Sequence, residues 1–151
     1  MFHRLRQKID FETLNMNTAI NENESPDMCS LAVSVINETD VSFAPDYTLL
    51  SGKWVKVPLS LPANQMDSSL QAFRSISRHH GAGIKGVVSY SSDHSDAIIF
   101  IRWDIPLSGN RLDVNVTCEG LDLGSYAIRL ENHVSHPNNY KSILYVTNSS
   151  A

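Results

Sequence analysis

The chain has 151 residues, of which 42% are hydrophobic and 19% charged, and its formal net charge is −4. A chain of this length can bury a core large enough to need neither a structural metal nor a disulfide. The acidic balance, with no cluster of basic and aromatic residues, argues against nucleic-acid binding.

The first 20 residues have the pattern of an amphipathic helix. Apolar residues recur near one face at spacings of three, four and seven, namely Phe2, Leu5, Ile9, Met16 and Ile20. The opening sequence MFHRLRQKID is basic but has no apolar core after it, so no signal peptide is expected. Residues 21–27, NENESPD, are polar and read as a linker. We therefore expect an N-terminal amphipathic segment and linker over 1–29 and a folded domain over 30–151.

From Ser30 onward the apolar period changes to two, which is typical of β-strands. Residues 126–131 fit either a short helix or a strand. Residues 58–68 contain two prolines and no regular period, which predicts a loop. Ala97–Ile101 is continuously apolar, as in a strand buried on both faces. Short strands separated by turns predict an all-β fold, a β-sandwich. The strands are expected near residues 30–36, 53–57, 69–77, 85–92, 96–104, 111–119 and 141–147.

The sequence carries no motif that indicates catalysis or a metal. His79 and His80 are adjacent, so in a strand they would face opposite sides. His133 and His136 have a ligand-like spacing but no accompanying acidic or cysteine cluster. No nucleophile elbow and no glycine-rich phosphate loop is present. We expect a protein that is not an enzyme, with no metal and no cofactor.

Two cysteines and two tryptophans leave alternatives open. Cys29 and Cys118 fit a reduced, buried pair, whereas a disulfide would require an oxidising compartment. Trp103 lies between Arg102 and Asp104 at the end of an apolar strand. It fits either a core aromatic or a ring at a ligand or bilayer interface. No apolar run approaches the ~20 residues that a transmembrane helix needs.

Residues 30–119 resemble the actinoporin-like pore-forming cytolysins. The resemblance is carried by five pieces in the same order, SLAVSVINETD, LLSGKWVKVPLSLP, GIKGVVSYSS, AIIFIRWDIP and a strand ending in VNVTCEG. An amphipathic segment ahead of the sandwich is also similar to that family. The resemblance implies an actinoporin-like β-sandwich with an N-terminal helix that inserts into a membrane, a fold shared by fungal fruit-body lectins.

The resemblance also implies a site for a lipid headgroup. In that family phosphocholine is held by a serine of a Ser-Gly turn, a Ser-Val-Pro step and a group of tyrosines. Ser51 matches the first serine, Pro106 the proline, and Tyr126 one of the tyrosines. Asp104 stands where the second serine would be, and the aromatic stretch after the proline is shortened, so the phosphocholine site is degenerate. Trp103, next to this step, is the expected aromatic contact.

Two hypotheses follow from these residues. The first is a membrane-attaching, pore-forming cytolysin that docks on phosphocholine or sphingomyelin lipids, inserts residues 1–20 and forms homo-oligomers on the membrane. The resemblance then implies secretion and association with a target membrane. The second is a non-lytic carbohydrate-binding or protein-interaction module on the same fold. The shortened aromatic loop favours the second, and the N-terminal apolar stripe favours the first.

Overall fold

The computed structural model describes residues 2–4, 28–106, 114–136 and 138–149, and all regular elements in these ranges are β-strands. In chain order they are β1 (Phe2–Arg4), β2 (Ser30–Asn37), β3 (Phe43–Ser51), β4 (Lys53–Lys56), β5 (Gln71–Ile76), β6 (Ile84–Ser92), β7 (Ile98–Ile105), β8 (Asn115–Leu121), β9 (Tyr126–His136) and β10 (Asn139–Asn148). The all-β prediction is confirmed for the described residues.

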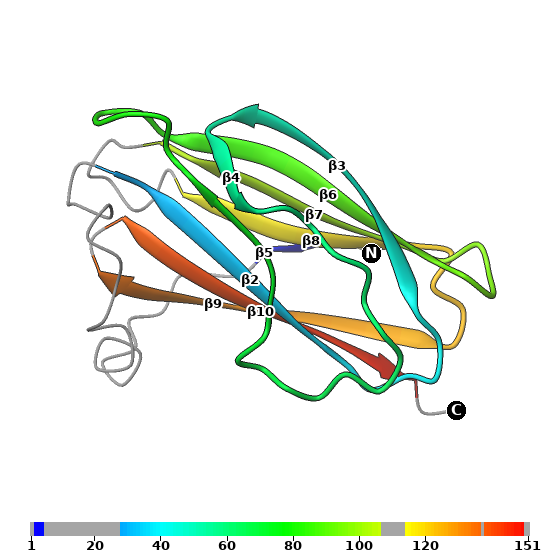
Figure 1. Cartoon of the computed structure of the whole chain (residues 1–151). Helices are drawn as coiled ribbons and strands as arrows, with labels where there is room; N and C mark the ends of the chain where they lie inside the picture. The colour runs from blue at the N-terminus through cyan, green and yellow to red at the C-terminus, as the bar shows by residue number, and fades with distance from the viewer. Residues whose placement is uncertain (1, 5–27, 107–113, 137, 150–151) are drawn as a thin grey trace.

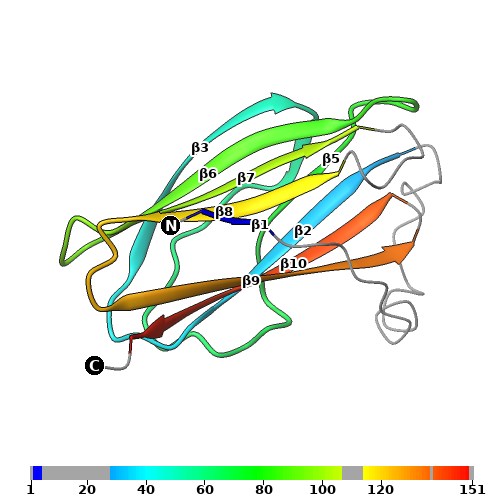
Figure 2. The ribbon, with the colours of Figure 1, turned by 180° about the vertical axis from the view of Figure 1, so that it is seen from behind.

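The strands form two five-stranded sheets that face each other (Figures 1 and 2). Sheet A has the order β1-β8-β7-β6-β3, and sheet B has the order β4-β5-β2-β10-β9. All neighbours are antiparallel except β2 and β10, which run parallel. The molecule is therefore a β-sandwich whose open edges include β3 in sheet A and β4 in sheet B.

The core lies between the sheets and follows the alternation of the strands. In β7 the buried side chains are Ile99, Ile101, Trp103 and Ile105, and the residues between them face outward. The prediction that this strand is buried on both faces is wrong, because Ile98 and Phe100 are only half-buried. An antiparallel sheet of a two-layer sandwich packs against the core with one face only.

Small residues let the largest side chain enter this core. Gly86 is the partner of Trp103 across β6 and β7, and a Cβ at Gly86 would lie 2.6 Å from Cζ2 of Trp103. Gly52, between β3 and β4, has a φ of +108°, which a residue with a side chain rarely adopts. The glycine of the Ser51-Gly52 turn is therefore needed for the chain to pass from sheet A to sheet B.

Of the helix and the strand considered for residues 126–131, the strand is confirmed as part of β9. The whole of β3 was not predicted. The helix predicted over residues 1–20 is wrong for Phe2–Arg4, because the backbone of these residues pairs with the edge of β8. The other residues of the apolar stripe, Leu5, Ile9, Met16 and Ile20, lie outside the described residues, as do residues 111–113 of a predicted strand.

Both cysteines are free and buried, and this predicts their reactivity. Burial raises the pKa of Cys29 and of Cys118 to about 11. Only about one thiol in a thousand would then be the reactive thiolate at pH 8. We expect both thiols to react with Ellman's reagent far more slowly in the native protein than in urea, with the rate rising as the pH approaches 11. Rapid titration of both thiols in the native protein at pH 8 would contradict this.

Candidate functional site

Ser51 and Pro106 lie at the same end of sheet A. The Ser51 hydroxyl donates a hydrogen bond of 3.3 Å to the carbonyl oxygen of Gly83. Gly83 in turn lies against the end of β7, since a Cβ there would be 2.4 Å from the Ile105 carbonyl oxygen and 2.9 Å from Cα of Pro106. The structure therefore brings together two of the four residues that the sequence assigned to a ligand.

Trp103 is a core residue. Its side chain is 2% exposed and stacks on Phe73 with ring centroids 5.4 Å apart. Trp54 lies edge-on to Trp103 at 6.0 Å, and Tyr47 lies edge-on to Trp54 at 5.4 Å. The rings thus form a chain of contacts from the core out to Tyr47, which is 40% exposed. Of the two interpretations of Trp103, the structure selects the core aromatic over the exposed ring.

Tyr126 lies at the opposite end of the sandwich from Ser51. Its ring packs edge-on against Phe43 at 5.9 Å, and Phe43 is the first residue of β3 whereas Ser51 is the last. At about 3.3 Å per residue, the length of β3 separates these positions by roughly 26 Å. The four predicted residues therefore do not surround one ligand.

A different surface stands out, and sequence reasoning missed it. Among the described residues, seven of the eight exposed large hydrophobic side chains fall between residues 47 and 70. They are Tyr47, Leu50, Val55, Val57, Leu59, Met66 and Leu70. We call this surface the apolar edge. Figure 1 shows its elements, the end of β3, β4 and the segment that leads to β5, along one side of the sandwich. Concentrated exposed apolar side chains of this kind mark interaction surfaces.

The charge of the apolar edge differs from that of the whole chain. Between Tyr47 and Met66 the only charged residues are Lys53 and Lys56, both on β4. The chain as a whole carries a formal charge of −4. With Asp67, which precedes Leu70, the formal charge of residues 47–70 is +1, in contrast to the acidic protein as a whole. The absence of Asp and Glu from residues 47–66 is visible in the sequence, and it was the signal that could have indicated this surface.

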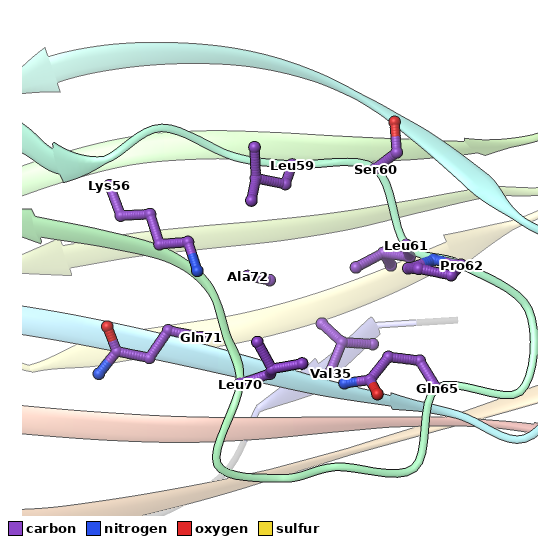
Figure 3. A pocket seen from close by; sticks show the side chains of 10 residues that line it. All are labelled: Val35, Lys56, Leu59, Ser60, Leu61, Pro62, Gln65, Leu70, Gln71 and Ala72. Carbon is purple, nitrogen blue, oxygen red and sulfur yellow. The ribbon is translucent and has the colours of Figure 1, made fainter.

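A pocket of about 200 Å³ opens within the apolar edge (Figure 3). It lies where the segment from Val57 to Leu70 passes over β5 and β2. Its wall is formed by the apolar residues Val35, Leu59, Leu61, Pro62, Leu70 and Ala72. The polar residues around it are Lys56, Ser60, Gln65 and Gln71. The pocket is therefore an apolar hollow with one charged group.

Backbone hydrogen bonds hold the segment over this pocket. Leu61 and Phe43 exchange two hydrogen bonds of 2.9 and 3.0 Å, which tie the segment to sheet A. The backbone N–H of Asn37 donates to the Gln65 carbonyl at 2.8 Å, and the backbone N–H of Leu59 donates to the Ala72 carbonyl at 3.2 Å. These two hydrogen bonds tie the segment to sheet B. The segment bridges both sheets, so the shape of the pocket depends on the folded sandwich.

A second hollow, of about 370 Å³, lies on the outer face of sheet A. Its polar lining includes Lys85 and Asp104, which form an exposed ion pair of 3.8 Å, together with Arg102. The guanidinium of Arg102 also lies 5.0 Å from the ring centroid of Phe100. This hollow offers hydrogen-bonding groups of both charges, in contrast to the apolar pocket.

Within the described ranges there is no helix with the length and apolar character that a membrane crossing requires. No family model matches the chain, and no curated protein matches it.

Solved structures with a similar fold include three proteins. RahU, solved in complex with a TRIS molecule, is 12% identical with a TM-score of 0.57, and the match covers 85% of this chain and 99% of RahU. IP-1A from Alcaligenes faecalis is 18% identical with a TM-score of 0.51, covering 83% and 93%. The lipid binding protein Nakanori is 10% identical with a TM-score of 0.56, covering 91% and 78%. At these identities the likeness shows the fold alone, and it is consistent with an actinoporin-like sandwich.

Proposed function

We propose that this protein binds lipid membranes and docks on them with the apolar edge. The observation that carries the proposal is the gathering of seven exposed hydrophobic side chains, with lysine as the only charged residue type between Tyr47 and Met66. The fold shared with Nakanori, a lipid binding protein, supports the same function.

The physical basis is transfer of these side chains into the headgroup region. Full burial of a Val or Leu side chain contributes about 1.5–3 kcal/mol, so a half-exposed one would contribute about 1 kcal/mol. Seven such side chains are sufficient for reversible attachment without a spanning segment. Lys53 and Lys56 would add attraction to anionic lipids.

The test is sedimentation with vesicles of phosphatidylcholine and phosphatidylserine. Leu50→Asp combined with Val55→Asp is expected to lower vesicle binding at least tenfold, because both side chains are more than half exposed on the apolar edge (64% and 53%). Leu121→Asp is the matched control, since Leu121 is 51% exposed on β8, away from that edge. Equal loss in both variants, or no binding by the unmodified protein, would overturn the proposal.

Pore formation and phosphocholine recognition are finer proposals on the same fold. A helix over residues 1–20 would require β1 to separate from β8, with which Phe2–Arg4 pair. Ser51 and Pro106 remain the candidates for a headgroup contact, because they lie together. Dye leakage from sphingomyelin vesicles, compared between the full chain and a chain without residues 1–20, tests the first. Sedimentation of Ser51→Ala with the same vesicles tests the second.

Glycan binding is the second candidate function, favoured by the hollow on the outer face of sheet A. Hydrogen-bonding side chains of both charges, such as Lys85, Arg102 and Asp104, suit sugar hydroxyls. Saturable binding on a glycan array that is lost in Asp104→Asn would support this function over membrane docking. Trp103→Ala would not be informative there, because Trp103 is part of the core.

A further inference from the structure

We infer that the pocket within the apolar edge binds the alkyl chain of a fatty acid, with the carboxylate against Lys56. This inference goes beyond membrane docking, because it concerns one molecule bound from solution. It rests on the composition of the wall, the size of the pocket and its single charge.

The wall of the pocket matches an alkyl chain. Val35, Leu61 and Ala72 form its buried part, each at most 9% exposed. Leu59 and Leu70 are exposed, and in Figure 3 both side chains point into the opening. An unbranched chain could enter past the two exposed leucines and contact the buried residues, which would remove apolar surface of both partners from water.

The size of the pocket matches a single alkyl chain. A volume of about 200 Å³ holds roughly seven water-sized groups at ~30 Å³ each. Pockets for drug-sized ligands begin at about 300 Å³, so a sterol or a complete two-chain lipid would not be enclosed. A chain of about seven methylene-sized groups fits this space.

The charge around the pocket selects an anion. Lys56 is the one charged residue among those that line it, and Figure 3 shows its ammonium group directed toward the opening. No acidic side chain of the described residues forms an ion pair with Lys56. Gln65 is occupied by two hydrogen bonds with the backbone of Asp67, of 2.9 and 3.1 Å. In Figure 3 the carboxamide of Gln71 is directed away from the other lining residues, so Lys56 is the group placed to meet a carboxylate.

Isothermal titration calorimetry with sodium octanoate, below its micelle concentration, tests the inference. The unmodified protein is expected to bind one octanoate and not to bind octyltrimethylammonium. Lys56→Gln is expected to weaken octanoate binding about tenfold, because a charge-assisted hydrogen bond is lost. Lys53→Gln, on the same strand but outside the pocket lining, is the matched control and should stay within about twofold. No octanoate binding, or equal binding of the cationic amphiphile, would overturn the inference.

Filling the pocket gives a second, independent arm. Ala72→Leu is expected to abolish octanoate binding. If Ala72→Leu does not fold, Leu70→Ser is the second variant, because Leu70 is exposed, and it is expected to weaken octanoate binding. Unchanged binding in folded variants would overturn the inference. Leu50→Asp with Val55→Asp should still bind octanoate, because neither residue lines this pocket. Octanoate binding and vesicle docking can therefore fail separately.

Discussion

Replacing Asn37 with alanine is expected to lower the free energy of unfolding by about 3 kcal/mol, because a fully buried amide that makes four hydrogen bonds is lost. The Asn37 side chain is 0% exposed. Its Nδ2 donates to the carbonyl oxygens of Val41 and Pro62, at 2.9 and 3.0 Å. Its Oδ1 accepts hydrogen bonds from the amide and the hydroxyl of Thr39, at 3.1 and 2.6 Å. One side chain thus holds both the turn after β2 and the segment over the pocket.

Urea unfolding followed by tryptophan fluorescence measures this loss. The matched control is Ser42→Ala, which removes one exposed hydrogen bond of 2.8 Å to Asp93 and should cost less than about 0.5 kcal/mol. A loss in Asn37→Ala no larger than that of the control would contradict the assignment. Because Asn37 holds Pro62, the same variant should also weaken octanoate binding, in protein that is still folded.

The central hairpin shows which parts of the fold the sequence could predict. β6 and β7 were expected at 85–92 and 96–104, and they pair from Ile84↔Ile105 to Ser91↔Ile98. Their alternation is regular because one face packs on the core and the other meets solvent. β3 was not predicted, because it lacks this regular alternation. It is an edge strand that contains Pro45, which an edge tolerates because one side of the strand lacks a partner.

The candidate site was less predictable, because it depends on which ends of the strands meet. Trp103 lies between two charged residues, and an alternating strand is compatible with either direction of its ring. The 2% exposure of Trp103 and its stacking on Phe73 show that the ring enters the core, which the sequence pattern leaves open. Tyr126 was grouped with Ser51 on the resemblance, whereas the topology places it beside Phe43. The prolines of residues 58–68 indicated a loop, and the apolar residues among them were not recognised as a surface.

Reversing the charge of Lys53 and Lys56 together, by Lys53→Glu and Lys56→Glu, is expected to weaken binding to phosphatidylserine-containing vesicles about a thousandfold. Each lysine near an anionic surface contributes about 1 kcal/mol, and each reversal changes two unit charges. The total is about 4 kcal/mol, at ~1.4 kcal/mol per tenfold change in affinity. Sedimentation at low and high salt measures the effect, which should shrink as salt screens the surface.

The matched control separates this local charge from the net charge of the protein. Arg129→Glu with Lys141→Glu makes the same change in net charge on β9 and β10, at the end of sheet B opposite β4 and away from the apolar edge. If the apolar edge meets the membrane, this control should retain most of the binding, because charges beyond a Debye length of about 8 Å are screened. Equal losses in the two double variants would mean that binding follows net charge alone. Docking through the apolar edge predicts instead that the lysines of β4 dominate the electrostatic part of the affinity.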